Sequence, residues 1–414
     1  MSFRFVHTAD IHLDSPLKSL AMRDKGLAEV VGNATRSTFR RIIDLCVEES
    51  VQALLIAGDL YDGGQTSMKT ARFLAHEIER LDAAGIPVFV IRGNHDAASK
   101  ITRELALPDN VTVFPGKAEV IETDWNGHSV AVHGISFRDP HAPETLLDRF
   151  APPVKGAFNI GMLHTSLGGA QGHDPYAPCA LTDLQATGFD YWALGHIHRR
   201  TIHLGTTTVV MPGIPQGRDI GEAGNKSVTL VMVADDGSVA VEERHLAVAQ
   251  FERLPVECRQ LTDWPDLIGA LMQALHTARQ EHTGEYLIVR PVLTGETPLA
   301  WRVGRDLDLL HAEAQNVAEQ IGTLGIDKIE VALTTIGNTS IGGAVEELAQ
   351  IIMQRSLPPD DPSVLEDVER LLKHLPRELR GLLGDSEEET TAAIEEMMRQ
   401  GAMDVLARLD EAGV

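Results

Sequence analysis

The feature that most restricts the fold is an alternation of short apolar runs with helical patterns, which begins at residue 3. The runs FRFVHTA, ALLIAGD and IPVFVIRGN are separated by helical patterns over residues 34–50 and 67–84. Such an alternation is typical of strands joined by helices in a layered α/β sheet. The later runs, from SVAVHGI to SVAVEER, mostly lack helices between them, as expected where a sheet ends with antiparallel strands. We therefore predict an α/β sandwich over residues 1–246.

Two further parts follow this sandwich. Residues 250–336 show a β-α-β-α-β order, with helical patterns over residues 264–279 and 306–322, and this order predicts a second, smaller α/β domain. A glycine-rich stretch then marks a linker over residues 337–343. The remaining residues, 344–414, are predicted to be mainly helical.

The charge of the chain excludes several classes of protein. The chain holds 36 Lys and Arg against 60 Asp and Glu, a formal net charge of −24, and residues 341–414 alone hold 17 acidic against 7 basic residues. A chain of this sign does not hold nucleic acid by overall attraction, so any contact with a polyanion must be local or pass through metal ions. Aromatic residues make up only 5%, which argues against a platform that stacks single-stranded bases.

The cysteines and the hydropathy pattern indicate the compartment. The three cysteines, at positions 46, 179 and 258, have no metal-ligand spacing and predict neither a disulfide framework nor a zinc finger. No apolar run of about 18 residues occurs, and the N-terminus lacks the apolar segment of a signal peptide. We therefore expect a cytoplasmic protein without a membrane-spanning segment.

Polar clusters occur where the predicted strands end. Strand ends of open α/β sheets are where ligand sites form, because the loops there converge on one crevice. Asp, Asn and His are all ligands of divalent cations, and the single residue between the two members of DIH and HIH lets both side chains reach the same side. The clusters contain Asp10 and His12; Asp59 and Asp62; Asn94, His95 and Asp96; His164; and His196 and His198.

Each cluster by itself has an ordinary explanation. A lone Asp-x-His is common, and Gly and Asn suit a turn without any catalysis. Their joint occurrence, each after a predicted strand, favours a metal site instead. A site with two cations about 3.5 to 4 Å apart needs a shared carboxylate, and such a pair clamps the attacking and leaving oxygens of a phosphoryl transfer. Asp59 is the natural candidate for the shared carboxylate.

The order of these clusters resembles that of the calcineurin-like metallophosphoesterases, whose linear pattern is D-x-H, GD, GNH, H and GHxH. Every element of the pattern is present here without substitution. The strings TADIHLD, AGDLYD, IRGNHD, LHTS and LGHIH more narrowly resemble the SbcD-type DNA double-strand-break repair nucleases, in particular the bacterial YhaO-like branch. The resemblance covers the first domain through its motifs and the second through its size and order. It implies a metallophosphoesterase α/β sandwich with an α/β capping domain and a C-terminal helical segment.

Carried onto this sequence, the resemblance implies two divalent cations and assigns their ligands. The metal of such proteins is usually Mn(II), and ligands without thiolate are also compatible with Fe or Zn. In this assignment His95 is not a ligand. One cation is held by Asp10, His12, Asp59 and His198, and the other by Asp59, Asn94, His164 and His196.

The resemblance also implies a catalytic pair. His95 would face the scissile phosphate and protonate the leaving group, and Asp62, three positions after the shared carboxylate, would orient it. A carboxylate beside an imidazole favours the protonated form, which is the form that a general acid requires.

The implied activity is that of a metal-dependent DNA exonuclease or phosphodiesterase. The nearest alternative is a metallophosphatase or phosphodiesterase that acts on a small or protein phosphoester with the same core. Serine/threonine phosphatases resemble GDxxDRG and GNHE, whereas the strings here are GDLYDGG and GNHD, so the arginine that helps to hold a phosphomonoester is absent. A third alternative is an interaction subunit that has lost activity, and the intact ligand set argues against it.

The expected partners are DNA and an ATPase. The helices of residues 344–414 carry apolar residues at helical spacing, and the resemblance implies that they dock onto an SbcC-like ATPase of the ABC/SMC type. The alternative is that they pack on their own domain. A homodimer is compatible with the same resemblance.

Basic residues near the motif loops form a predicted phosphate-binding rim: Lys100, Arg103, Arg138, Arg199 and Arg218.

Overall fold

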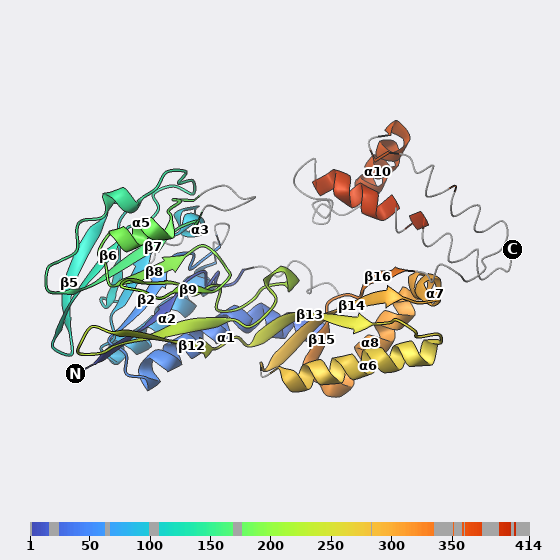
Figure 1. The fold of residues 1–414 in the computed structure, drawn as a ribbon, viewed down its shortest axis with the longest axis horizontal. Helices are drawn as coiled ribbons and strands as arrows, with labels where there is room; N and C mark the ends of the chain where they lie inside the picture. Colours follow the sequence, from blue (N-terminus) through green and yellow to red (C-terminus); the bar gives the residue numbers. More distant parts are fainter. Residues whose placement is uncertain are drawn as a thin grey trace. The chain divides into compact units, whose positions relative to one another are not determined.

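The chain divides into two compact units in a computed structural model (Figure 1). The first unit comprises Met1–Glu252 with His282–Ile288, and the second comprises Arg253–Glu281 with Val289–Val414. The structure describes residues 2–15, 25–62, 67–98, 107–168, 176–282, 284–334, 351, 358–359, 361–374, 389–398 and 401–402.

The first unit contains two six-stranded sheets, and the first of them has the order β12-β11-β1-β2-β3-β4. Strands β1 to β4 run parallel to one another, whereas β11 is antiparallel to both β1 and β12. The predicted antiparallel end of the sheet is therefore confirmed. The strands are β1 (Phe3–Thr8), β2 (Ala53–Ala57), β3 (Val88–Ile91), β4 (Val111–Val113), β11 (Ser227–Val233) and β12 (Val239–His245).

The second sheet has the order β5-β6-β7-β8-β10-β9. Its four inner strands are parallel, and the two edge strands are antiparallel to their neighbours. The hairpin of β5 and β6 turns at Asn126 and Gly127, whose φ angles are 55° and 84°, as a two-residue Asn-Gly turn requires. The strands are β5 (Glu119–Trp125), β6 (His128–Gly134), β7 (Phe158–His164), β8 (Tyr191–Gly195), β9 (Thr201–His203) and β10 (Thr208–Met211).

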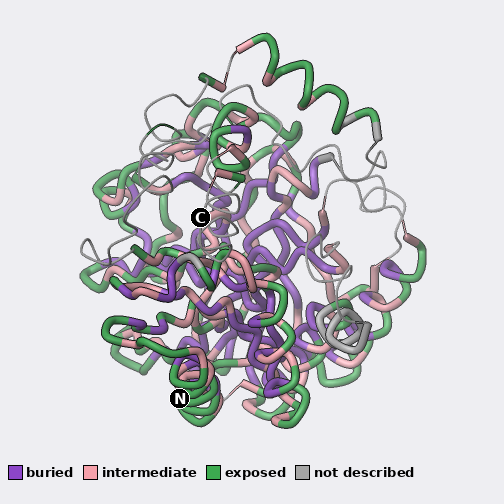
Figure 2. The backbone as a smooth tube through the Cα atoms, turned by 90° about the vertical axis from the view of Figure 1, so that its right-hand side faces the viewer, coloured by how far each residue is buried: buried purple, intermediate pink, exposed green. Residues whose placement is uncertain are grey.

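The two sheets pack face to face, and helices cover their outer faces. The core between the sheets includes Phe5, Leu55 and Ile160. Helices α1 (Lys25–Glu48) and α2 (Met68–Ala83) bury their apolar sides against the other face of the first sheet. Because β2 is covered on both faces, all five of its residues are apolar and buried. The predicted α/β sandwich is confirmed, and Figure 2 colours the backbone by this burial, with buried residues in purple.

Helix α1 is longer than its sequence pattern predicts. It begins at Lys25 rather than at residue 34 and runs through Gly32 and Asn33, which favour a turn by propensity. A Cβ at Gly32 would meet nothing within 4 Å. This glycine therefore costs the helix about 0.5–1 kcal/mol relative to alanine but does not force a turn.

The second unit follows the predicted β-α-β-α-β order with two corrections. The last strand of this order is two short strands, and Asp327 between them accepts a hydrogen bond from Arg290 Nε at 2.7 Å. A short helix, α7, precedes α8 and was not expected. The elements are β13 (Ala249–Glu257), α6 (Trp264–Glu281), β14 (Tyr286–Glu296), α7 (Ala300–Arg305), α8 (Leu307–Ile321), β15 (Leu324–Ile326) and β16 (Glu330–Thr334). The first residues of two of these strands, β13 and β14, belong to the first unit.

Only parts of the C-terminal segment belong to the described residues. They include α10 (Pro362–His374) and a helical stretch over residues 389–398. The predicted linker over residues 337–343 lies outside the described residues, as does most of the segment over 344–414. Among the helices that the structure describes, none is long and apolar enough to cross a membrane.

Candidate metal centre

Five strands of the first unit end beside the predicted metal ligands. Asp10 follows β1, Asp59 follows β2 and Asn94 begins α3 (Asn94–Ala98) after β3. In the second sheet, His164 is the last residue of β7 and His196 follows β8. The strands run parallel within each sheet, and β2 packs against β7 and β8. Their carboxyl ends therefore bring the motif loops to one place.

The backbone at these loops is strained. Asp10, His12, Asp59 and His196 all have φ in the left-handed region, at 51°, 44°, 51° and 100°. Residues other than glycine adopt this region rarely and at a cost of roughly 1–3 kcal/mol each. The strain is held by hydrogen bonds between the loops, in which His12 N donates to Asp59 O at 3.0 Å. Strain gathered at one group of polar residues is typical of a functional site.

The motif glycines are required by close packing around the ligands. A Cβ at Gly58 would lie closer than 3.0 Å to the His164 ring, and a Cβ at Gly93 would overlap the carboxylate of Asp59. The Asp96 side chain lies in the same loop as Gly93. It accepts hydrogen bonds from the backbone N–H groups of Gly93, Leu60 and Tyr61. The glycines and Asp96 thus lock the two loops together.

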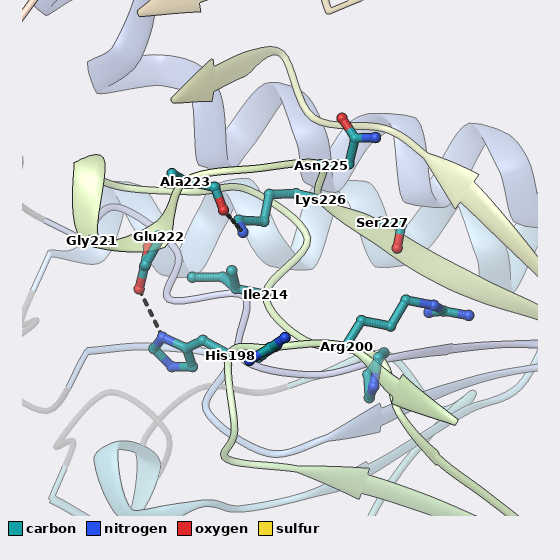
Figure 3. A pocket seen from close by; sticks show the side chains of 11 residues that line it. His198, Arg200, Ile214, Gly221, Glu222, Ala223, Asn225, Lys226 and Ser227 are labelled. Atoms are coloured by element: carbon teal, nitrogen blue, oxygen red, sulfur yellow. Dashed lines mark hydrogen bonds and ion pairs between the residues drawn. The ribbon is translucent and has the colours of Figure 1, made fainter. Parts of the chain in front are cut away.

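The first group of converging ligand atoms belongs to Asp10, His12 and His198, which lie within 4.8 Å of one another. His12 Nδ1 donates to Asp62 at 2.8 Å, and His198 Nδ1 donates to Glu222 at 2.7 Å (Figure 3). In the neutral rings both Nε2 atoms carry lone pairs, and they face each other at 3.2 Å. Two such lone pairs beside a buried carboxylate repel unless a cation lies between them, so these residues fit a divalent metal.

The second group contains Asp10, Asp59 and His164, again within 4.8 Å. His164 Nδ1 donates to Ala57 O at 2.9 Å, so its Nε2 faces Asn94 Oδ1 at 3.1 Å and Asp59 Oδ2 at 3.3 Å and holds a proton in the protein alone. Burial alone would lower the pKa of His164, but the Asp59 carboxylate outweighs it and raises that pKa to about 9. This site therefore attracts positive charge strongly.

Asp59 was the expected shared carboxylate, but Asp10 is the carboxylate that lies in both groups of ligand atoms. Asp59 belongs to the second group. The pKa of Asp10 is raised by burial, and that of Asp59 is lowered because its histidine neighbours outweigh its burial. The role of Asp59 as the bridge between two cations stays a prediction.

His196 reaches the centre through its backbone, and its ring, which belongs to neither group of converging ligand atoms, lies beside His164. Its N–H donates to both carboxylate oxygens of Asp10, at 3.1 and 3.0 Å. Its ring centroid lies 5.2 Å from that of His164 and 5.0 Å from that of Tyr176. Burial, assisted by the positive charge of His164, lowers the pKa of His196 to about 3. The ring is therefore neutral near pH 7, as a metal ligand must be.

The predicted catalytic pair lies at the edge of the same cluster. His95 Nδ1 is 3.5 Å from Asp62 Oδ1, but the same oxygen is closer to His12, so Asp62 orients a predicted ligand as well. Burial lowers the pKa of His95, and the carboxylates of Asp59 and Asp62 oppose that shift. Asp62 thus raises the pKa of His95, as expected, but in the protein alone burial lowers this pKa by more.

Glu222 is a functional residue that sequence reasoning missed. It lies in a single helical turn, η2 (Ile220–Glu222), and fixes His198. Arg218 Nη2 donates to the same carboxylate at 2.6 Å, and Arg218 Nη1 lies 3.7 Å from Asp62. The only signal in the sequence is the four-residue spacing of Arg218 and Glu222. Burial alone would raise the pKa of Glu222, but hydrogen bonds from His198 and Arg218 lower it.

The predicted phosphate-binding rim is only partly placed at the centre. Arg218 lies beside it, clamped by Glu222. Arg199 is exposed and follows His198 directly. Arg138 instead donates from Nε to Gly116 O at 2.9 Å. Lys100 and Arg103 lie outside the described residues.

Comparison with known proteins shows the family of the chain. Residues 3–200 match the family described as calcineurin-like phosphoesterase, and residues 251–334 match that described as metallophosphoesterase YhaO, middle domain. The chain is 34% identical to the uncharacterized metallophosphoesterase YhaO of Bacillus subtilis over 297 residues, which is 71% of this chain and 72% of that protein.

Two archaeal relatives are more distant. The DNA double-strand break repair protein Mre11 of Methanocaldococcus jannaschii is 25% identical over 63% of this chain and 68% of its own length. Its namesake from Sulfurisphaera tokodaii is 28% identical over 48% of this chain and 50% of its own length. On the identity to YhaO and the match over the motif-bearing strands, the chain belongs to the calcineurin-like metallophosphoesterases.

Proposed function

We propose that this metallophosphoesterase is a metal-dependent DNA exonuclease of the double-strand-break repair type, which hydrolyses phosphodiester bonds. The observation that carries the proposal is the facing pair of Nε2 atoms of His12 and His198, 3.2 Å apart and next to buried Asp10. Together with Asp59 and His164 they form a donor set for two adjacent divalent cations. The relatives named as DNA double-strand break repair proteins support DNA as the substrate.

The donor set restricts the metal. All candidate ligand atoms are carboxylate or amide oxygens and imidazole nitrogens, because no cysteine belongs to the groups among the described residues. Such a set suits Mn(II), our expected cation, and is also compatible with Fe or Zn. When bound, two divalent cations neutralise the negative charge that develops on the phosphodiester oxygens.

The residues of the chain supply orientation and a proton. His95 is the open member of the cluster, with 43% of its side chain exposed, whereas the side chains of Asp10, His12 and His164 are buried. Its Nδ1 faces Asp62, so Nε2 is the atom that can reach a leaving oxygen. We assign to it the transfer of a proton to that oxygen, with Asp62 holding the ring.

We further propose that residues 344–414 bind an SbcC-like ATPase. Helix α10 carries apolar residues at helical spacing, yet Leu365 and Leu371 are 43% and 46% exposed. None of the α10 residues whose burial the structure describes is buried. A helix with an uncovered apolar side suits a docking segment.

A nuclease assay tests the proposed activity. The purified chain should degrade linear duplex or single-stranded DNA from the ends when Mn(II) is present, and should be inactive in EDTA. A p-nitrophenyl phosphate monoester and bis-p-nitrophenyl phosphate serve as comparison substrates. Mn-dependent hydrolysis of these esters without hydrolysis of DNA would contradict the proposal and favour the small-phosphoester alternative.

A further inference from the structure

A cavity of about 380 Å³ lies against His198 in the first unit. The loop after β8 forms one wall, with His198, Arg199 and Arg200, and the segment before β11 forms another, with Glu222 and Lys226 (Figure 3). Apolar side chains of residues 212 and 214 complete the lining. A volume of this size falls within the range of ligand pockets, roughly 300–1,000 Å³.

The charge of this cavity is opposite to that of the chain. Three cations, Arg199, Arg200 and Lys226, line it against one carboxylate, Glu222. That carboxylate already receives hydrogen bonds from His198 and Arg218. In a chain with a net charge of −24, a cavity with an excess of cations indicates an anionic ligand.

Within the described part of the chain, the charge and the hydrogen-bond donors of the Arg200 guanidinium are only partly matched by partners. Its Nη1 donates to Thr229 Oγ1 at 2.7 Å, and its Nε lies 3.8 Å from Glu243. The Nε and Nη2 atoms are buried without a hydrogen-bond partner there. Burial lowers the pKa of Arg200, against the opposing carboxylate of Glu243. An anion in the cavity would reduce this cost, because a buried charge is stabilised by a nearby opposite charge.

Lys226 and its neighbours supply donors on the opposite wall. The Lys226 ammonium donates to Ala223 O at 2.8 Å, as Figure 3 shows, and this bond uses one of its three donors. Asn225 and Ser227 also line the cavity and carry polar side chains. Because the Ser227 hydroxyl already donates to Glu243 Oε1 at 2.8 Å, the cavity combines cations with one neutral donor, the Asn225 amide. Cations and neutral donors together bind phosphate oxygens.

The position of the cavity connects it to the metal centre. The His198 ring separates the two, because its Nε2 faces Asp10 and His12 whereas its Nδ1 faces Glu222 on the cavity wall. One imidazole ring therefore lies between the predicted metal ligands and the cavity.

We propose that the cavity is a phosphate-binding subsite, which receives a phosphate of the substrate strand next to the one at the metal centre. This inference rests on the proposed function, since it takes a polynucleotide as the substrate. Arg199, Arg200 and Lys226 then act as specificity residues, which favour a strand with several phosphates over an isolated phosphodiester.

The test measures binding without metal and without catalysis. The full chain is titrated in EDTA with a fluorescein-labelled 12-nucleotide oligothymidylate, and fluorescence anisotropy is followed at several salt concentrations. Each lost phosphate contact should weaken binding several-fold and reduce the slope of log K against log salt by about 0.7. We expect this result for Lys226→Gln and for Arg199→Gln, which leave buried side chains intact, and for Arg200→Gln if its melting temperature is preserved.

Lys155→Gln is the matched control. It removes the same charge from an exposed position before β7, at the end of that strand opposite His164, and should leave the slope unchanged. Unchanged slopes in Lys226→Gln and Arg199→Gln would overturn the inference. So would a loss of inorganic phosphate binding in these variants without any effect on the oligonucleotide, because the cavity would then hold free phosphate only.

Mn-dependent hydrolysis of the same oligonucleotide separates this inference from the proposed function. Binding that depends on the cavity residues, without hydrolysis by the wild-type chain, supports the subsite and contradicts the nuclease. Hydrolysis together with unchanged slopes supports the nuclease and overturns the subsite.

Discussion

Three imidazoles of the centre are each fixed through Nδ1. The acceptors are the Asp62 carboxylate for His12, the Ala57 carbonyl for His164 and the Glu222 carboxylate for His198. A hydrogen bond of this kind sets the tautomer and leaves Nε2 free for a metal. These acceptors therefore determine metal affinity although they are not ligands.

Glu222→Gln should weaken metal binding by about 10- to 100-fold, which is the usual effect of losing such an acceptor. The glutamine keeps the size of the side chain but loses the charge that fixes His198 and Arg218. Titration with Mn(II) followed by calorimetry measures the change. Glu285→Gln is the control, because it removes an exposed pairing with Arg41 instead. An affinity equal to wild type would show that Glu222 does not position His198 for a metal.

His95→Ala should separate chemistry from metal binding. Because His95 is assigned to the leaving oxygen and not to a cation, the variant should retain its metal while its rate falls by about 10²- to 10⁴-fold. Elemental analysis of the variant, beside kinetics on DNA, measures both quantities. If the metal content falls together with the rate, His95 is a ligand and the assignment is wrong.

Sequence reasoning could place the ligand candidates because each stands in a short motif directly after an apolar strand. It could not find Glu222, which reaches His198 across 24 residues from a single helical turn. Nor could it show that Asp62 lies closer to His12 than to His95. These contacts form between separate loops. The spacing of residues along the chain does not predict which side chains of different loops meet.

At the scale of elements, the junction of strand and loop is where the chain is strained and tightly packed. Gly93 follows β3 and leaves no room for a side chain beside Asp59. The β2 and β3 loops are further tied through Asp96. Substitution of one motif glycine should therefore disturb both loops.

Gly93→Ala should destabilise the fold by about 1–3 kcal/mol, the usual cost of overpacking, and should reduce metal binding because Asp59 must shift. Gly269→Ala in α6 is the opposite control. A Cβ there meets nothing within 4 Å, so alanine should stabilise the helix by about 0.5–1 kcal/mol. Denaturant unfolding measures both changes. A Gly93→Ala chain as stable as wild type and with full metal content would contradict the packing account.

The elements with the clearest sequence signal were the buried parallel strands, such as β2, whose residues are all apolar. Elements at the edges of the sheets were harder to predict from the sequence. Strand β5 mixes exposed and half-buried residues and buries only its last residue, Trp125. Only the Asn126-Gly127 turn marks its hairpin. Helix α1 crosses a glycine that local propensity treats as a break, because packing of its later turns against the first sheet outweighs that propensity.

At the scale of the whole molecule, the region that matches the YhaO middle domain is followed by an acidic segment. Residues 341–414 hold 17 acidic and 7 basic residues, and α10 exposes two leucines. This composition is consistent with a segment that another protein covers.

Truncation after Gly337 should leave a folded chain that binds metal and hydrolyses small phosphodiesters almost as well as the full chain. Binding to an SbcC-like ATPase, and any ATP-stimulated degradation of duplex DNA, should be lost. Thermal unfolding and co-purification with the ATPase measure the two effects. Aggregation or a large fall in melting temperature would show that the helices complete the core of this chain, and would contradict the docking proposal.

We expect the motif loops to form a centre for two cations. Equilibrium dialysis of the purified, metal-stripped chain against Mn(II) tests this expectation most directly. We expect two Mn(II) ions per chain, and a lower number in Asp59→Asn, whose asparagine tolerates the left-handed backbone but removes a buried carboxylate. Binding of one ion or none by the folded wild-type chain would contradict this expectation.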